Sequence, residues 1–173
     1  MDTRRLTLLR HGQAEPADGF PEDFERTLTR RGASEAREIA ARIARRSPIP
    51  ELILVSPAMR TWATAAQVAV ACELDSRQVR SARELYLAAP ATLWRLVTSL
   101  NPGVGHVLVC GHNPALSQIA SRLGPKPRSR ELATAGVATA VWSATGWADL
   151  EPETAVSCTL DGPQDMADSD SQV

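Results

Sequence analysis

The stretch RLTLLRHG, residues 5–12, is a short apolar run that ends in arginine, histidine and glycine. A mainly apolar run of this length is typical of a strand that is buried on both faces of a sheet. We therefore predict a strand over Arg5–Leu9 that delivers Arg10 and His11 to the end of a sheet. In open parallel sheets, ligands bind beyond the carboxyl ends of the strands, so these two side chains are candidates for function.

The same order, an apolar strand followed by a loop and a helix, recurs twice along the chain. Leu52–Val55 and Val107–Cys110 are the other two apolar runs. Ser56-Pro57 follows the first, and Asn113-Pro114 follows the second with two residues between. Serine or asparagine before a proline is a strong helix start, with the polar residue as N-cap and proline in the first turn.

Weaker patterns complete the predicted fold. Thr29 is expected to cap a helix through Arg46, because apolar residues recur there at helical spacing. The other expected elements are a strand at Gln78–Ala82, a helix at Ala91–Leu100 and an antiparallel edge at Val137–Trp142 and Thr154–Cys158. Helices that alternate with continuously apolar strands predict an α/β fold, a three-layer α/β/α arrangement with a mostly parallel central sheet.

Length and composition indicate one globular domain. The 173 residues are 43% hydrophobic and 23% charged, and the net charge is −1, which directs the chain to neither nucleic acid nor an anionic membrane. No apolar run approaches the roughly 20 residues of a membrane span. We predict a cytoplasmic protein with no nucleic-acid or membrane partner. The domain is expected over residues 1–160, with residues 161–173 as an acidic, disordered tail.

Residues His11, Arg60 and His112 share one position in this scheme, just after a strand or in the first turn of the next helix. Arg60 is unusual there, because a cation in the first turn faces the positive end of the helix dipole at a cost of roughly 0.3–1 kcal/mol. A bound anion would remove that cost. Two histidines, two arginines (Arg10 and Arg60) and helix N-termini at one edge predict a phosphoryl pocket with a nitrogen nucleophile. Gly12 would let the backbone approach the phosphate closely.

Metal and thiol chemistry are not indicated. The three cysteines are far apart and form no Cys-x-x-Cys motif, so neither a disulfide framework nor a thiolate zinc site is expected. A cysteine-dependent phosphatase needs an arginine six positions after its cysteine, and none occurs at those positions. No His-x-x-x-His pair or carboxylate cluster supplies a divalent site. We predict a protein with no metal and no cofactor.

Three motifs together carry a family resemblance: LLRHG (8–12), SPAMR (56–60) with Thr64-Ala65, and CGHNP (110–114). In order and spacing they resemble the histidine phosphatase superfamily, which implies a phosphoglycerate mutase-like fold. The short chain, LTRRG (28–32) and ELYLA (84–88) are most similar to the compact SixA-like phosphohistidine phosphatases, which lack the large insertions of phosphoglycerate mutases.

The resemblance implies a role for each residue at the predicted edge. His11 matches the nucleophile that becomes transiently phosphorylated, and Arg10, Arg60 and His112 match the groups around the phosphate. The chemistry agrees, since two arginines and a cationic histidine can neutralise phosphoryl oxygens without a metal. His11 must attack as neutral imidazole, so its second ring nitrogen is expected to donate to a backbone carbonyl or a similar acceptor.

Several other polar residues allow both a functional and a purely structural interpretation. Glu84, after the third predicted strand, is the best candidate for a general acid, although an ordinary solvated carboxylate is the alternative. Ser56 and Asn113 are N-caps first, and they are also candidates for substrate binding. His106, beside a glycine at a strand start, is expected at the surface.

Three functions stay open on the sequence. A protein phosphohistidine phosphatase is favoured, because the connections after Gly12 and after Ala82 are too short to build a deep cap, and because an N–P bond breaks without a strong acid. A small-molecule phosphomonoesterase is favoured if a shaped or basic pocket adjoins His11 and Glu84 points into it. A non-catalytic phosphate-binding module is the third, and the presence of both histidines and both arginines argues against it.

Overall fold

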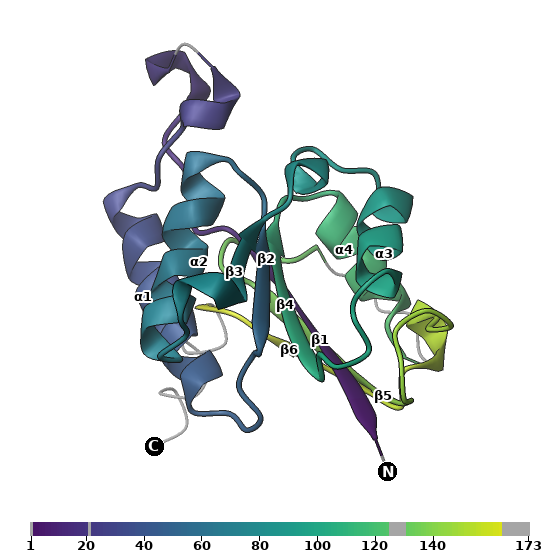
Figure 1. The fold of residues 1–173 in the computed structure, drawn as a ribbon. Coiled ribbons are helices and arrows are strands. Elements are labelled where there is room, and N and C mark those ends of the chain that lie inside the picture. Colours follow the sequence, from purple (N-terminus) through teal and green to yellow (C-terminus); the bar gives the residue numbers. More distant parts are fainter. Residues whose placement is uncertain (1, 21, 125–130, 164–173) are drawn as a thin grey trace, which may run out of the picture.

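A six-stranded sheet, in the order β3-β2-β4-β1-β5-β6, forms the middle of the computed structural model (Figure 1). The structure describes residues 2–20, 22–124 and 131–163. The strands are β1 (Thr3–Arg10), β2 (Leu52–Val55), β3 (Val79–Ser81), β4 (His106–Gly111), β5 (Val137–Ser143) and β6 (Ser157–Asp161). The strands β1 to β4 are parallel to one another, whereas β5 pairs antiparallel with β1, and β6 pairs antiparallel with β5 at the edge. The predicted mostly parallel sheet with an antiparallel edge is confirmed.

Two pairs of helices cover the sheet, one pair on each face (Figure 1). The helices are α1 (Arg30–Ala44), α2 (Met59–Ala71), α3 (Pro90–Thr98) and α4 (Ala115–Arg122). The first two lie on one face and the last two on the other, which confirms the three-layer α/β/α fold. In the parts of the chain described, no helix is both long and apolar enough to cross a bilayer.

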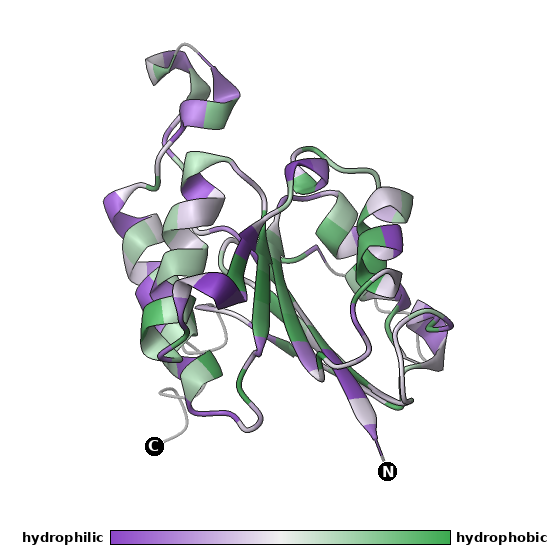
Figure 2. Ribbon diagram, in the orientation of Figure 1, coloured by the Kyte–Doolittle hydropathy of each residue, from purple (hydrophilic) through white to green (hydrophobic). Residues whose placement is uncertain are grey.

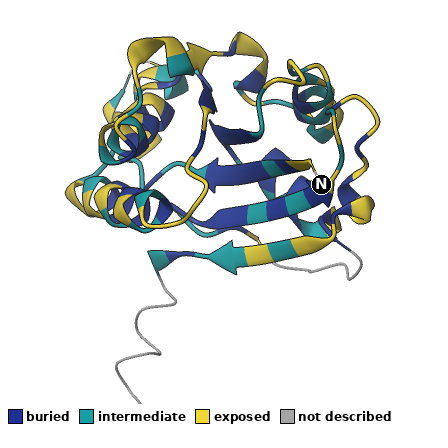
Figure 3. Cartoon of the chain, turned by 60° about the horizontal axis from the view of Figure 1, so that its bottom comes forward, coloured by how far each residue is buried: buried dark blue, intermediate teal, exposed yellow. Residues whose placement is uncertain are grey.

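The core is divided into two layers by the sheet. Every residue of β2 and β4 is buried, and successive side chains alternate between the layer under α1 and α2 and the layer under α3 and α4. Figure 2 shows the central strands as mostly hydrophobic, and Figure 3 shows them as buried, in contrast with the outer helix faces. Because both faces are covered, the central strands offer polar side chains to a ligand only at their ends.

Predicted helix starts are correct at one position and wrong at two. Thr29 caps α1, since its hydroxyl oxygen accepts from the Gly32 amide at 2.9 Å. Ser56 does not cap α2, which begins at Met59 and has no side-chain cap. Asn113 does not cap α4, which begins at Ala115 after Pro114. The serine and asparagine side chains bind tertiary partners instead, so each motif marks the turn out of a strand and not the helix cap.

The last strand differs from the prediction in position. A 3-10 turn at Pro152–Thr154 delays it, so that β6 spans Ser157–Asp161 instead of Thr154–Cys158. It also runs one residue past the expected end of the domain. The Asp161 carboxylate accepts from Arg42 Nη1 at 2.5 Å and also pairs with Arg46. Residues 164–173 of the expected tail lie outside the described residues.

His106 is buried, and the expectation that it lies at the surface is wrong. It is the first residue of β4 and only 4% exposed, because β4 lies between β1 and β2 and the loop before β2 covers it. Its Nδ1 lies 2.9 Å from the Pro48 carbonyl oxygen, and its Nε2 lies 2.9 Å from the Thr7 hydroxyl. Nδ1–H donates to the carbonyl and Nε2 accepts from the hydroxyl, so His106 is a neutral imidazole.

Acidification should therefore destabilise the protein through His106. Burial lowers its pKa to about 4, although the hydrogen bond to the Pro48 carbonyl acts to raise it. In the unfolded chain the pKa is about 6.5, so the unfolded chain binds a proton first as the pH falls. Stability that is present at pH 7 is lost toward pH 5. We expect His106 to contribute about 2 kcal/mol to the fall in unfolding free energy between these values.

Urea unfolding of the wild type and of His106→Gln at both pH values checks this expectation. Other titrating groups act equally in both proteins, so the difference between the two pH dependences isolates His106. The same pH dependence in the two proteins would contradict the buried neutral imidazole.

Candidate active site

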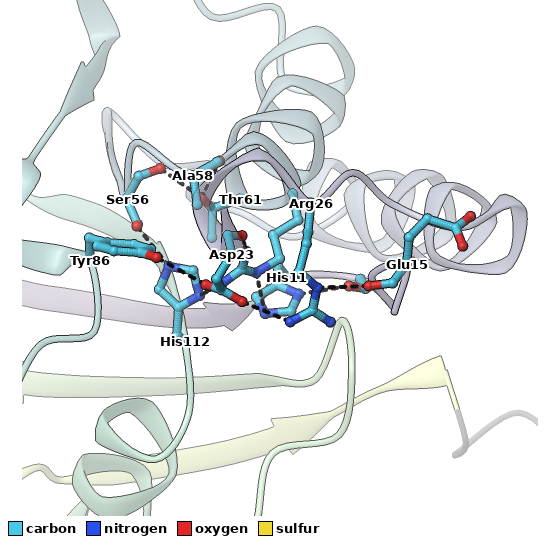
Figure 4. A network of polar contacts seen from close by, with 11 residues as sticks. His11, Glu15, Asp23, Arg26, Ser56, Ala58, Thr61, Tyr86 and His112 are labelled. Atoms are coloured by element: carbon cyan, nitrogen blue, oxygen red, sulfur yellow. Dashed lines mark hydrogen bonds and ion pairs between the residues drawn. The ribbon is translucent and has the colours of Figure 1, made fainter. Parts of the chain in front are cut away.

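Three predicted residues meet at the carboxyl edge of the sheet. His11 follows β1, His112 follows β4, and Arg60 lies in the first turn of α2. Arg60 Nε lies 3.3 Å from His11 Nε2, and Arg60 Nη2 lies 3.4 Å from His112 Nδ1. The two imidazole rings are edge to face with centroids 5.3 Å apart, as Figure 4 shows from close by. One guanidinium group therefore contacts both histidines.

His11 has the geometry that a nitrogen nucleophile requires. Its Nδ1 lies 2.7 Å from the Gly12 carbonyl oxygen, so Nδ1–H donates and Nε2 keeps its lone pair. This backbone acceptor was expected from the sequence. Burial lowers the pKa of His11 to about 4, and the charges of Arg60 and Arg10 add to that effect while the Gly12 carbonyl opposes it. His11 is therefore neutral at neutral pH.

His112 is also neutral, whereas the sequence predicted a cation. Its Nε2 lies 2.7 Å from the Ser56 hydroxyl, and its Nδ1 accepts from Arg60. Burial, followed by the proximity of His11 and Arg60, lowers the pKa of His112 to about 3. Ser56 thus contributes by fixing the orientation of the His112 ring, and the positive charge near His11 comes from arginine.

Arg10 and Asn113 hold the same segment beside the site. Arg10 Nη1 donates to the Leu132 carbonyl oxygen at 2.6 Å, and Asn113 Nδ2 donates to it at 2.9 Å. Both also contact the Glu131 carboxylate, at 3.5 and 3.1 Å. Within the described ranges, Arg10 Nε is buried without a hydrogen-bond partner. A buried donor of this kind suits an anion, whereas Asn113 contributes as a support for the segment at residues 131–132.

Gly12 is constrained by packing. A Cβ atom at this position would lie 2.4 Å from the Gly32 carbonyl oxygen, which is at the start of α1. The Gly12 amide donates to the Thr64 hydroxyl of α2 at 3.1 Å. The structure thus shows a close approach between the segment after β1 and α1, and the admission of phosphate by Gly12 stays a prediction.

An arm formed by the described part of residues 13–29 reaches the site, although the sequence indicated no cover there. It projects beyond α1 and α2 (Figure 1), and its two sides pair through Glu15 and Thr27. Its 3-10 turn η2 (Asp23–Glu25) brings Asp23 to Arg60. Asp23 Oδ2 accepts from Arg60 Nη2 at 2.8 Å and from the Tyr86 hydroxyl at 3.0 Å.

The arm holds the Asp23 carboxylate from its own side as well. Asp23 Oδ1 accepts from Arg26 Nη1 at 2.8 Å, and Arg26 Nε donates to the Glu15 carbonyl at 2.7 Å. Partial burial raises the pKa of Asp23, but the hydrogen bonds from Arg26, Arg60 and Tyr86 outweigh it and hold the pKa well below its ordinary value. No periodicity or motif in the sequence distinguishes Asp23 from other loop residues, and Tyr86 lies in the ELYLA segment (84–88), in which the sequence indicated Glu84 as the candidate.

Glu84, the predicted general acid, is exposed on the 3-10 turn η4 (Arg83–Leu85). None of the polar contacts described for the site involves it. A cavity of about 490 Å³ adjoins the site, and it is lined by Glu22, Phe24, Pro57, Ser81, Arg83 and Tyr86. The Tyr86 ring is edge to face with both Phe24 and His112, at 5.4 and 5.7 Å between centroids. The cavity therefore opens beside the histidines, but Glu84 does not line it.

Metal ligands do not gather at this edge. Among the residues that the structure describes, no three His, Cys, Asp or Glu side chains are grouped so that they could hold a metal ion. The charged groups that can meet an anion here are arginines.

Comparisons with known proteins agree with this geometry. The family model of the histidine phosphatase superfamily (branch 1) matches residues 6–92. An uncharacterized protein of Mycobacterium tuberculosis is 30% identical over 153 residues, which cover 83% of this chain and 92% of that protein.

Solved structures show the same fold. A proposed phosphohistidine phosphatase SixA from Nakamurella multipartitia superposes with a TM-score of 0.80 at 25% identity, covering 94% of this chain and 98% of that one. A mycobacterial glucosyl-3-phosphoglycerate phosphatase superposes with a TM-score of 0.63 at 18% identity, covering 92% of this chain and 98% of that one. The fold is thus shared by proteins named for a phosphohistidine substrate and for a small phosphate ester.

Proposed function

This chain belongs to the histidine phosphatase superfamily, whose members act on phosphoryl groups, and from that premise we propose that it removes the phosphoryl group from phosphohistidine on a protein. His11 is the nucleophile of this proposal. The observation that carries it is the neutral His11 ring, with Nδ1–H bound to the Gly12 carbonyl and Nε2 directed at the guanidinium of Arg60.

The proposed reaction has two displacements at phosphorus. In the first, His11 Nε2 forms a bond to phosphorus, the P–N bond to the substrate breaks, and the leaving nitrogen takes a proton from solvent. In the second, water attacks the phosphorylated His11, so that inorganic phosphate leaves and the imidazole is restored. Arg60 and Arg10 neutralise the phosphoryl oxygens in both steps. His112 holds Arg60 through Nδ1, and Ser56 fixes the His112 ring.

Two features support a protein phosphohistidine over other substrates. The leaving nitrogen of a phosphoramidate is protonated near neutral pH, so the reaction tolerates the position of Glu84 outside the site. The similarity to a proposed SixA phosphatase is the second feature. The corresponding partner is a phosphorylated histidine-containing protein. The location of this chain in the cytoplasm stays a prediction.

A small phosphate ester is the second candidate, and the cavity beside Tyr86 favours it. Phe24, Tyr86 and Pro57 give the cavity apolar and aromatic walls, and Arg83 adds a cation. These walls suit a flat ring that carries a further anionic group. The sequence set two conditions for this function. The first, a shaped pocket at the site, is met. The second, that Glu84 points into this pocket, is not met.

A dephosphorylation panel distinguishes the candidates. We expect kcat/KM for a phosphorylated histidine-containing domain to exceed that for sugar phosphates and nucleotides by at least about a hundredfold, or roughly 2.7 kcal/mol in transition-state binding. The panel is run with and without a chelator, because the proposed reaction uses arginines in place of a metal. A sugar phosphate or nucleotide that matches the protein substrate would establish the second candidate. Activity that is lost on chelation and restored by a divalent ion would contradict metal independence. The absence of turnover on every substrate would instead support the third function, a non-catalytic phosphate-binding module.

A further inference from the structure

We propose that Asp23 is a catalytic residue, the acid that protonates the leaving group and the base that then activates water. The inference rests on the proposed phosphatase function and extends it to phosphate esters, whose alkoxide or phenoxide leaving groups need a proton. It also assigns to Asp23 of the arm the role of general acid that the sequence predicted for Glu84.

The position of the carboxylate relative to the nucleophile is the first argument. Arg60 is 3% exposed and its guanidinium connects the two groups: Nε lies 3.3 Å from His11 Nε2, and Nη2 lies 2.8 Å from Asp23 Oδ2. Nucleophile and carboxylate thus lie at different ends of one phosphate-binding fork. In-line displacement places the attacking and leaving atoms on opposite sides of phosphorus. When a phosphoryl group binds to the Arg60 guanidinium and His11 attacks it, the leaving atom therefore points away from His11. That is the side on which the Asp23 carboxylate lies.

The adjoining cavity gives the second argument. Its walls include Phe24, which follows Asp23 in the chain, and Tyr86, whose hydroxyl donates to the Asp23 carboxylate. Figure 4 shows Asp23 in front of the two imidazole rings, with the Tyr86 hydroxyl beside it. Asp23 therefore lies at the boundary between the phosphoryl position and the cavity that suits a leaving group.

The third argument is that the carboxylate is held independently of Arg60. Arg26 binds Asp23 Oδ1 and is itself fixed to the Glu15 carbonyl within the arm. When a phosphoryl group takes the Arg60 donors, Asp23 loses one cationic partner and gains a negative neighbour. Both changes raise the pKa of its carboxyl from the depressed value of the unliganded site. Arg26 and the arm keep the carboxyl in place for proton transfer.

The proton and bond changes balance in both steps. In the first, the His11 Nε2–P bond forms, the P–O bond to the leaving group breaks, and the Asp23 proton passes to the leaving oxygen. In the second, a water oxygen bonds to phosphorus, its proton passes to the Asp23 carboxylate, and the P–N bond to His11 breaks. Inorganic phosphate leaves, and both residues return to their starting forms for the next substrate.

Leaving-group dependence tests the proposal. We compare wild type and Asp23→Asn on p-nitrophenyl phosphate, whose leaving group is stable as an anion, and on phenyl phosphate, whose leaving group is not. The measured quantity is kcat/KM, which covers the steps through the first irreversible one. We expect Asp23→Asn to lose at least about a hundredfold on phenyl phosphate and less than about tenfold on p-nitrophenyl phosphate. Glu25→Gln removes the same charge from an exposed residue of the same turn, and Glu84→Gln tests the alternative acid; neither should change kcat/KM more than about twofold on either ester.

Each contrary outcome has a distinct meaning. Equal losses of Asp23→Asn on both esters would overturn the proton role and leave a positioning role for the arm. A gain on both would mean that the carboxylate only competes with the phosphoryl group for Arg60. A hundredfold loss of kcat/KM in Glu84→Gln on phenyl phosphate would identify Glu84, and not Asp23, as the general acid. The thermal midpoint of each variant shows that it folds. Failure of the proposed function itself is separate, because the wild type would then give no phosphorylated His11 with a phosphorylated histidine-containing domain or with either ester.

Discussion

Replacing His11 with alanine should abolish turnover while leaving the protein folded. We expect kcat to fall by at least about ten-thousandfold, because the variant has no nitrogen to form the covalent intermediate and the remaining groups only bind phosphate. The side chain lies at a strand end and is not fully buried, so its removal costs little packing. Steady-state turnover of a phosphorylated substrate and the thermal midpoint are the two measurements.

A histidine outside the site provides the matched control for His11. His106→Gln changes a buried imidazole of the same sheet, yet at pH 7 it should retain turnover if the loss in His11→Ala is chemical. Rapid quenching of the wild type without acid should trap a phosphorylated peptide that contains residue 11. Turnover in His11→Ala comparable to that of the wild type would exclude the covalent mechanism.

Arg60→Lys should have the second-largest effect. Arg60 donates to His11, to His112 and to both the backbone and the side chain of Asp23. A lysine keeps the charge but not the planar fork, so it cannot make these contacts together. Loss of one preorganised donor costs about a hundred- to a thousandfold, and we expect kcat/KM to fall by about a thousandfold. Binding of inorganic phosphate as a product inhibitor should weaken in parallel.

The control for Arg60 is an exposed arginine that lies outside the site. Arg77 has a side chain that is 88% exposed and pairs with Asp75, and Arg77→Lys should leave kcat/KM within about twofold. A loss smaller than about tenfold in Arg60→Lys would show that charge alone is sufficient at this position. The fork geometry would then have no part in catalysis.

The predictable part of the site is local in the chain. An apolar run long enough for a strand, followed within a few residues by a histidine or an arginine, defines a strand end without knowledge of the rest of the fold. Parallel pairing then brings every such end to one edge, because parallel strands all point the same way. His11, Arg60 and His112 could therefore be placed together from sequence alone, and the carbonyl acceptor for the second ring nitrogen of His11 followed from the need for a neutral nucleophile.

Residues that meet through loops could not be placed in this way. Asp23 and Tyr86 belong to connections 63 positions apart, and they meet only because the arm folds over the start of α2. A polar loop residue has the same local pattern whether it faces water or another side chain. The partners of Ser56 and Asn113 were mistaken for helix amides for the same reason, since a capping motif reports the turn and not the nearest tertiary donor.

The choice between Glu84 and Tyr86 shows what tertiary structure decides. Both lie in one short segment, and the sequence identified the carboxylate as the chemically obvious residue. The turn η4 buries Leu85 in the core at 2% exposure, and that burial directs Glu84 to solvent and leaves Tyr86 toward His112. The sequence by itself determined the layers, the sheet edge and the residues at the strand ends, because these follow from local patterns of apolar and polar residues. Only the folded chain decided which loop side chains face that edge, because their directions depend on the packing of neighbours that are distant in the sequence.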